Sequence, residues 1–394
     1  MTVHEDRRPR LRIAYVVNNA AFFVSHRLAI ALAARQAGHE VMLITGQAGS
    51  QTLEAGALQN LVAAAMPHRA VGFSSSGMNP LKEAVGFFQV LSNLRRFRPD
   101  IVHCVSPKGV LYGGLAARLM RSKGLVLAVS GMGYLFTGEF RGWKAMLRRG
   151  YGTLVKFAFG HTNMRCIVQN RDDWRMLEQL GLARQDQLVL IPGSGVNLSE
   201  YEHLDPSARK KLVVLPARLL KDKGVVEFAH AARMLRESGC DWRFALVGTA
   251  DYQNPSAVPL DEVQGWVQAG YVEWWGHRTD MVSVFAEASI VCLPSYREGM
   301  PKALLEAAAA GCAVVTTDVI GCREAVLNGE TGDLVPARDT AALASTLLAL
   351  INDPPRLACY AAAGRRFAAS RFGLDAVIER TLAIYLELMP RAVE

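Results

Sequence analysis

The sequence predicts an α/β protein built from two doubly wound, Rossmann-like parallel-sheet domains in tandem. Short runs rich in β-branched residues alternate with Ala- and Leu-rich stretches, which is typical of βαβ units. The alternation stops at a polar stretch, residues 197–210, and then begins again. With 394 residues, of which 51% are hydrophobic and 20% charged, the chain is long and apolar enough for two globular cores. We therefore expect a first domain over residues 1–200 and a second over residues 201–372.

Each expected strand is a short apolar run that ends in a polar or glycine-containing turn. In the first domain these runs lie at residues 12–17, 40–45, 101–105, 125–129, 166–169 and 188–191. In the second they lie at residues 212–216, 244–247, 272–274, 290–293, 313–316 and 332–335. Helices are expected between them, for example at 25–37 and 110–120, and a last helix at 375–388. Because ligands bind outside the carboxyl ends of strands in such sheets, residues just after the strands are the first functional candidates.

Composition excludes several other classes of protein. The longest apolar run near the centre of the second domain, residues 307–315, is too short to span a bilayer, and the run at 13–17 is too short for a signal peptide. Seven cysteines without a CxxC pair argue against a disulfide framework and against a zinc site. We therefore expect a cytoplasmic protein without a bound metal.

The net charge of +8 is unevenly distributed along the chain. Residues 1–200 carry 24 Lys/Arg and 12 Asp/Glu, whereas residues 201–394 carry 20 and 24. The first half therefore favours an anionic partner, and charge alone leaves nucleic acid, an anionic membrane surface and a phosphorylated substrate open.

The segment from Pro294 to Glu306 has the most informative order of residues in the chain. An expected strand leads into a glycine loop and then a helix, with Pro301 suited to the first helical position and Gly311 just past the end. Backbone N–H groups of Gly299 and Met300 would then lie where a phosphate or a sugar hydroxyl can be held. Glu306 lies in an almost wholly apolar helix, so its carboxylate needs hydrogen-bond donors, either from a ligand or from a structural network.

A second segment places two cations after the first strand of the second domain. Arg218 follows this strand, and Lys223 precedes Gly224, where the next helix is expected to begin. A guanidinium and an ammonium together suit a diphosphate, although two surface charges are also commonplace.

These motifs resemble those of the retaining nucleotide-sugar glycosyltransferases of family 4, and the resemblance covers nearly the whole chain. It implies the GT-B fold, in which two Rossmann-like domains face each other across a cleft and the C-terminal helix, about residues 373–394, crosses back to the first domain. It also implies that Arg218 and Lys223 grip the diphosphate of a UDP-sugar, that Glu306 binds the ribose and that Glu298 contacts the transferred sugar. Gly276 and His277 resemble the loop that reads the base, and Gly299, Met300 and Pro301 complete the donor site.

The first half is similar to a narrower group, the transferases of bacterial polysaccharide and glycan assembly such as lipopolysaccharide O-antigen. The similarity lies at residues 22–28, 78–82, 99–108 and 131–137, and His103 matches a histidine near the reacting sugar. It implies an acceptor glycan on undecaprenyl diphosphate, and a donor sugar that is an N-acetylhexosamine by association only. Two departures are residues 18–21, Asn-Asn-Ala-Ala, where many relatives have paired glycines, and Ser194, where many have Asn.

A basic segment in the first half suggests how a lipid-linked acceptor could be reached. No acidic residue occurs between Glu139 and Asp172, and on a helical wheel one side is basic while the other is apolar. The apolar side includes Leu154, Phe157 and Ala158, and only Val155 breaks the pattern. Such a helix either lies on an anionic membrane surface or packs on the core with a basic solvent face. The candidate residues for the membrane surface are Trp143, Lys144, Arg148, Arg149 and Lys156, and those for the acceptor diphosphate are His26, Arg27 and Lys108. The expected location is therefore the inner leaflet of the bacterial plasma membrane, with peripheral attachment.

The expected mechanism needs no metal or other cofactor. Arg218 and Lys223 would stabilise the departing UDP, and the acceptor hydroxyl would attack from the same face, losing its proton toward the leaving phosphate. No Asp-x-Asp triplet occurs in the chain. A GT-B sugar-nucleotide epimerase is the main alternative. A dinucleotide-dependent dehydrogenase or a P-loop NTPase is less well supported, because neither GxGxxG nor Walker A motif is complete. A non-catalytic membrane or nucleic-acid binder is disfavoured by the Glu298 to Glu306 motif, so no nucleic-acid partner is expected.

Overall fold

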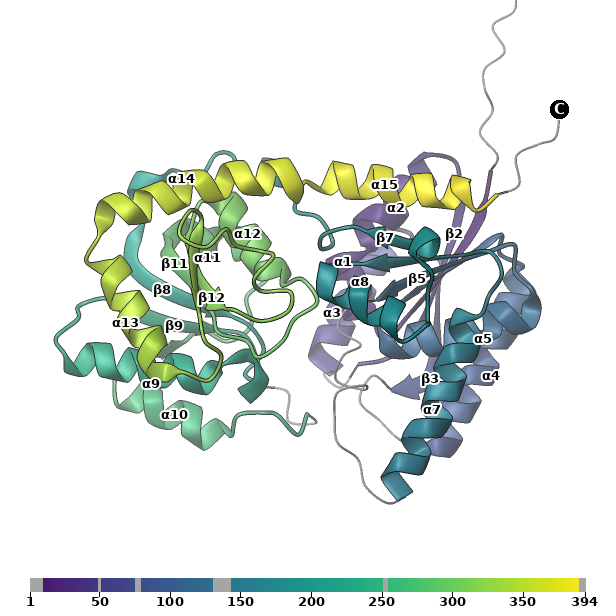
Figure 1. The fold of residues 1–394 in the computed structure, drawn as a ribbon, viewed down its shortest axis with the longest axis horizontal. Coiled ribbons are helices and arrows are strands. Elements are labelled where there is room, and N and C mark those ends of the chain that lie inside the picture. Colours follow the sequence, from purple (N-terminus) through teal and green to yellow (C-terminus); the bar gives the residue numbers. More distant parts are fainter. Residues whose placement is uncertain (1–9, 49–50, 75–78, 130–142, 251–253, 390–394) are drawn as a thin grey trace, which may run out of the picture. The chain divides into compact units, whose positions relative to one another are not determined.

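The computed structural model describes residues 10–48, 51–74, 79–129, 143–250 and 254–389. It divides into two compact units: unit 1 comprises Met1–Leu190 with Ile378–Glu394, and unit 2 comprises Ile191–Val377. Each unit is organised around its own parallel sheet (Figure 1). The expected fold class, two parallel-sheet α/β domains, is confirmed.

Unit 1 contains a seven-stranded sheet in the order β3-β2-β1-β4-β5-β6-β7, and every described pairing is parallel. Apart from β3, its strands match the expected apolar runs within two residues at the start and two at the end. Their bounds are β1 Arg12–Val17, β2 Glu40–Gln47, β3 His68–Ser74, β4 Ile101–Val105, β5 Gly124–Val129, β6 Met164–Val168 and β7 Leu188–Leu190.

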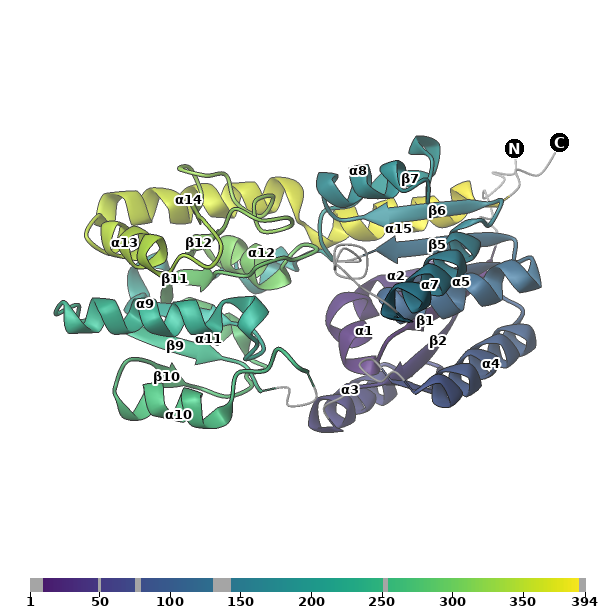
Figure 2. The same cartoon turned by 60° about the horizontal axis from the view of Figure 1, so that its bottom comes forward.

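Helices cover both faces of this sheet (Figure 2). On one face α4 packs against α5 and α5 against α7, and on the other α1 packs against α2 and α3. The bounds are α1 Ala20–His26, α2 Leu28–Gln36, α3 Gln51–Ala63, α4 Pro80–Phe97, α5 Pro107–Met120, α7 Trp143–Phe159 and α8 Arg171–Gln179. The last helix, α15 (Leu374–Glu387), contributes its residues from Ile378 onward to unit 1.

Unit 2 repeats the architecture with a six-stranded parallel sheet in the order β10-β9-β8-β11-β12-β13. The strands are β8 Lys210–Pro216, β9 Arg243–Val247, β10 Glu273–Trp274, β11 Ala288–Leu293, β12 Ala313–Thr317 and β13 Gly332–Val335. The helices are α9 Val225–Glu237, α10 Leu260–Gln268, α11 Met281–Glu287, α12 Lys302–Ala310, α13 Thr340–Ile351 and α14 Pro354–Arg371. The central strands β8 and β11 are almost wholly buried, as expected for a sheet covered on both faces.

Two features differ from the expectations. The helix expected over residues 25–37 is two helices, because α1 already begins after Asn19, whose side chain accepts from Phe22 N at 2.8 Å, and breaks at Arg27 with φ −134°. The strand β3 was not expected at all: it pairs only with β2 at the sheet edge, and its first residues are polar and exposed. Within the described residues, no helix is long and apolar enough to cross a membrane.

Candidate functional site

The strand orders single out one place in each sheet where a ligand is most readily bound. In open α/β sheets this place lies outside the carboxyl ends of the two strands at which the order reverses. In unit 1 these are β1 and β4, and in unit 2 they are β8 and β11. The segments that the sequence singles out, after residues 17, 105, 216 and 293, follow these four strands.

In unit 2 the two loops that follow β8 and β11 meet through an ion pair. Lys223, at the end of the short 3₁₀ helix Lys221–Lys223, places its Nζ 2.5 Å from Oε1 of Glu298. Ser295 Oγ donates to the same oxygen at 2.8 Å. The side chains of Lys223 and Glu298 are 20% and 13% exposed, so both charges are largely removed from water. Arg218 follows β8 directly and is exposed.

Two glycines allow this meeting by letting backbone segments approach closely. Gly224 has φ +71°, and a Cβ there would lie 2.1 Å from Pro294 O, just after β11. Gly321 has φ +81°, and a Cβ there would lie 2.5 Å from Glu298 O and 2.6 Å from Gly299 O. Since both clashes involve backbone atoms, neither position has room for a side chain. The glutamate loop is therefore packed closely by main chain at both positions.

Glu306 has a partner within its own helix, so a structural contact supplies one of the donors that its carboxylate needs. Lys302 Nζ lies 2.8 Å from Glu306 Oε1, one turn away in α12. Glu306 also faces Tyr201, whose pKa is raised by burial and further by this carboxylate. Pro301 is the N-cap of α12 rather than its first residue, and Gly311 ends the helix in the left-handed conformation as expected. The sequence reasoning missed Lys302, although its spacing of four from Glu306 was visible.

The expected base-reading loop lies beside the carboxyl end of β9. Gly248 N donates to Gly276 O at 2.8 Å, and Trp274 Nε1 donates to Gly248 O at 2.8 Å. His277 is exposed, and Gly276 has φ +67° with open space around its Cα. Met300 and Pro301 are buried at the start of α12, whereas Gly299 is partly exposed. Gly248 and Gly276 thus follow the paired strands β9 and β10, whereas Gly299, Met300 and Pro301 follow β11, on the other side of β8.

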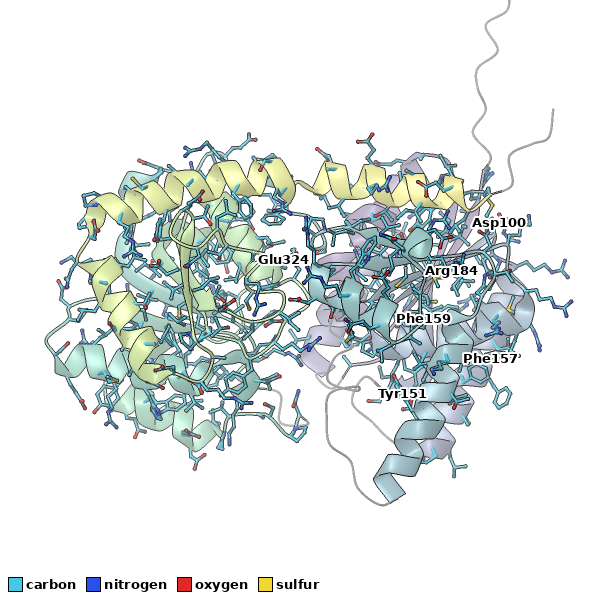
Figure 3. The ribbon with its side chains drawn as sticks, in the orientation of Figure 1. Asp100, Tyr151, Phe157, Phe159, Arg184 and Glu324 are labelled. Atoms are coloured by element: carbon cyan, nitrogen blue, oxygen red, sulfur yellow. The ribbon has the colours of Figure 1, made fainter. Side chains whose placement is uncertain are left out.

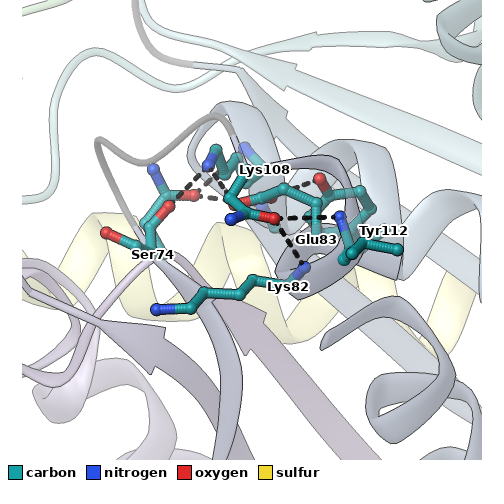
Figure 4. Close-up of polar contacts among 9 residues, drawn as sticks. Ser74, Lys82, Glu83, Lys108 and Tyr112 are labelled. Atoms are coloured by element: carbon teal, nitrogen blue, oxygen red, sulfur yellow. Dashed lines mark hydrogen bonds and ion pairs between the residues drawn. The ribbon is translucent and has the colours of Figure 1, made fainter. Parts of the chain in front are cut away.

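In unit 1, the N-terminus of α5 lies at the reversal between β1 and β4, and a side chain already fills it. Asn18 Oδ1, just after β1, accepts from the backbone N–H groups of Lys108 and Gly109, both at 3.1 Å. The Lys108 ammonium lies 2.8 Å from Glu83 Oε1 and donates to Ser74 O at 2.5 Å (Figure 4). Tyr112, one turn further along α5, donates to the other oxygen of Glu83. The charge of Lys108 is therefore balanced within unit 1.

His103, which matches a family histidine near the reacting sugar, is the third of five residues in β4. Its side chain is fully buried. Its Nδ1 is 2.6 Å from the hydroxyl of Tyr385 in α15, which is in turn 2.6 Å from the hydroxyl of Tyr15. The Nε2 atom has no hydrogen-bond partner among the described residues. Burial, with a smaller contribution from the Arg27 charge, holds the pKa of His103 well below its usual value.

Two other residues predicted for the acceptor diphosphate have contrasting environments. Arg27, at the break between α1 and α2, is 4% exposed, and no carboxylate of the described residues pairs with it. Burial lowers its pKa, and the hydroxyls of Tyr15 and Tyr385 oppose the shift. His26 is partly exposed, stacks on Phe22 with ring centroids 4.2 Å apart, and has Nδ1 2.6 Å from Ser25 Oγ.

The basic segment contains the helix α7, and the apolar residues that this helix buries differ from the expected ones. Val155, expected to break the pattern, is buried with Ala158 and Phe159, whereas Leu154 and Phe157 of the expected apolar side are exposed. Phe157 and Phe159 are labelled in Figure 3. The cause is packing: α7 lies on α5, whose surface selects which part of the apolar arc is covered. Lys156 is exposed. The side chains of Trp143, Lys144, Arg148 and Arg149, and the segment 131–137, lie outside the described residues.

The described residues contain no group of three or more His, Cys, Asp or Glu side chains that could hold a metal ion.

Comparison with known proteins matches both halves of the chain to family models. Residues 12–169 match the model "Glycosyl transferase 4-like" and residues 210–353 match "Glycosyl transferases group 1". The chain is 29% identical over 295 residues to the N,N'-diacetylbacillosaminyl-diphospho-undecaprenol alpha-1,3-N-acetylgalactosaminyltransferase of Campylobacter jejuni, covering 71% of this chain and 75% of that protein. It is 24% identical over 286 residues to an Escherichia coli UDP-Gal:alpha-D-GlcNAc-diphosphoundecaprenol alpha-1,3-galactosyltransferase, covering 69% and 72%.

Solved structures share the fold at low sequence identity. A glycosyltransferase from Rickettsia africae superposes with a TM-score of 0.74 at 16% identity, covering 98% of this chain and 100% of the other. Anabaena Alr3699/HepE in complex with UDP-glucose gives a TM-score of 0.73 at 18% identity, covering 95% and 100%.

Proposed function

Because this chain belongs to the two-domain glycosyltransferases of the GT-B fold, we propose that it moves a sugar from a UDP-sugar to a glycan carried on a polyprenyl diphosphate. The observation that carries the proposal is the Lys223–Glu298 pair at the reversal of the second sheet, where two charged loops meet at the carboxyl ends of β8 and β11. The UDP-sugar donor and the undecaprenyl-linked acceptor are supported by the names of the relatives, and the donor sugar that those names favour is galactose or N-acetylgalactosamine.

The residues of unit 2 suggest how the donor is held. Lys223, which reaches Glu298, and Arg218, two residues after β8, would neutralise the charge that builds on UDP as it departs. Glu298, released from Lys223 by the diphosphate, would accept hydrogen bonds from the transferred sugar. Glu306, held by Lys302, would accept from the ribose hydroxyls. The loop around Gly276 and His277 would read the base.

We further propose that the reaction retains the configuration of the donor and needs no metal. Stabilisation of the leaving UDP by Arg218 and Lys223 supplies the positive charge that a divalent cation supplies in other transferases. The proton of the acceptor hydroxyl would pass to the departing phosphate on the same face. The measurement is product stereochemistry by NMR and activity after exhaustive chelation; an inverted product or a complete requirement for a divalent ion contradicts this part.

An acceptor on undecaprenyl diphosphate would hold the enzyme at the inner leaflet of a bacterial plasma membrane, as a peripheral protein. Unit 1 would then contribute the acceptor site, with Arg27 as its strongest candidate, because a buried guanidinium without a carboxylate partner is stabilised by an incoming phosphate. Lys108 is a weaker candidate since Glu83 already balances it. The Lys108–Glu83 pair, with an ammonium donor and a carboxylate acceptor, also suits the hydroxyl groups of an acceptor sugar.

The first experiment is thermal unfolding of the purified chain with UDP, GDP, ADP, their sugar conjugates and NAD. A ligand at about a hundred times its Kd stabilises the native state by about 2.7 kcal/mol, which is a shift of several degrees. Lys223→Met should abolish the shift, and Lys221→Met, two residues away in the same 3₁₀ helix, is the matched control. A shift with NAD alone contradicts the proposal, as does consumption of a UDP-sugar that yields an epimer and no glycoside.

A further inference from the structure

An exposed apolar stripe on α4 points to a different membrane contact from the one that the basic segment predicted. Leu81, Val85 and Phe88 are 79%, 55% and 64% exposed, and their spacing of four and three keeps them within an arc of roughly 60° on the helix. The opposite side of α4, including Val90 and Leu94, is buried against the sheet. Three large apolar side chains in a row on solvent are unusual for a surface helix and mark an interaction site.

The charges of the surrounding helix layer identify the partner by complementarity. The helices α4, α5 and α7 pack side by side on one face of the first sheet. Their sequences contain nine Lys/Arg and one acid, Glu83. That acid pairs with Lys108. The other described cations of the layer are Lys82, Arg95, Arg96, Arg118 and Lys156, so its described side chains carry net positive charge. An apolar stripe beside such a field suits an anionic lipid surface, since phosphate headgroups meet the cations and acyl chains receive the apolar side chains.

The position of the stripe along α4 fits a lipid-linked substrate. Leu81 lies in the first turn, directly before Lys82 and Glu83, and Glu83 contacts Lys108 at the carboxyl end of β4. The stripe therefore begins at the edge of the sheet where a ligand is expected. On α7, in contrast, the buried Val155, Ala158 and Phe159 are already used in the core, and the exposed Leu154 and Phe157 lie in its last two turns.

We propose that the α4 stripe of Leu81, Val85 and Phe88 is the element through which this chain enters the apolar region of an anionic lipid leaflet, with the basic residues of α4, α5 and α7 as its electrostatic support. The inference rests on the proposed function only in that a lipid-linked acceptor makes such contact useful. It names a surface that the sequence analysis did not single out.

The test is sedimentation of the purified full chain with large vesicles of phosphatidylglycerol and phosphatidylethanolamine, or of phosphatidylcholine alone, at low and high salt. Binding should require the anionic vesicles and weaken with salt. Changing Leu81, Val85 and Phe88 together to Ser should weaken the partition coefficient by roughly a hundredfold. Because all three are more than half exposed, the melting temperature should stay near that of the unchanged chain.

Two matched variants separate this proposal from its rivals. Val62→Ser removes an apolar side chain that is 80% exposed on α3, a helix that does not belong to the α4–α5–α7 layer, and should leave binding within twofold. The double change Leu154→Ser with Phe157→Ser, on α7, should weaken binding far less than the α4 change. The proposal is overturned if α7 carries the effect, if neutral vesicles bind equally, or if no vesicle binds. It is also overturned if the α4 change instead converts a dimer to a monomer. UDP-sugar binding in the thermal assay would survive all of these outcomes, so the transferase proposal is tested separately.

Discussion

The charged loops of unit 2 and the interior of unit 1 stabilise their polar side chains in different ways. In unit 2, Lys223 with Glu298 and Lys302 with Glu306 are opposite charges that keep some contact with water. In unit 1, Tyr15, Tyr385 and His103 form an uncharged chain of hydrogen bonds with no exposure. Ion pairs at partly exposed positions can exchange partners with a charged ligand at modest cost, whereas a sealed chain of phenols and imidazole cannot. The difference indicates that unit 2 provides the adaptable charges and that the interior of unit 1 is a rigid support.

The largest expected effect comes from breaking the ion pair of unit 2. Lys223→Met should lower kcat/KM by about two to three orders of magnitude, because in the proposed mechanism the leaving diphosphate loses a cation that acts in the transition state. Steady-state kinetics of UDP release measure it, with Lys221→Met as the control that keeps the rate. Equal rates for Lys223→Met and the unchanged chain would mean that a residue other than Lys223 supplies the adaptable charge.

The close approach of the glutamate loop gives the next largest effect. Gly321→Ala should destabilise unit 2 by about 3 kcal/mol or more, since its Cβ would overlap two backbone oxygens. Gly329→Ala is the matched control: it has a similar φ of +78° but open space, so only backbone strain of about 1 kcal/mol is expected. Urea unfolding compares them. Similar losses of unfolding free energy in the two variants would mean that the glutamate loop can shift to make room for a Cβ at position 321 and is not held in place by main-chain packing.

The sealed chain in unit 1 predicts unequal effects for its two tyrosines. Tyr385→Phe removes hydrogen bonds to both His103 and Tyr15 and should cost about 2–3 kcal/mol of unfolding free energy. Tyr15→Phe removes one of them and should cost about 1 kcal/mol. Denaturant titration of both variants gives the comparison, and a larger loss for Tyr15→Phe would contradict the central place of Tyr385.

The smallest effect is a pH dependence to which His103 of the sealed chain contributes. The pKa of His103 is well below its usual value in the folded state because of burial, while it returns to about 6.5 on unfolding. The unfolded state therefore binds more protons below about pH 6.5, and stability is lost as pH falls from there toward the folded pKa. His103→Gln should make the stability curve between pH 7 and 5 less steep. An unchanged slope would assign the dependence to the buried His39 and His161 and the half-buried His68, whose pKa values are also lowered.

Most of the fold could be predicted from the sequence, because strands buried on both faces are continuous apolar runs with clear ends. The exceptions are explained by context. The edge strand β3 has one neighbour and a polar start, and the break at Arg27 depends on where Asn19 begins the preceding helix. On α7 the wheel identified an amphipathic helix but not its buried arc, which the surface of α5 decides.

The sequence by itself determined the order of elements and the residues that could act on a donor, since Arg218, Lys223, Glu298 and Glu306 follow strands at recognisable spacings. Only the tertiary structure decided what those residues touch. Lys223 meets Glu298 across 75 positions, and His103 meets Tyr385 across 282. Such contacts depend on which strands become neighbours and on glycines that let loops approach, and neither follows from local periodicity. The exposed stripe of α4 has the same origin, because its apolar spacing also suits a core helix and only packing leaves it uncovered.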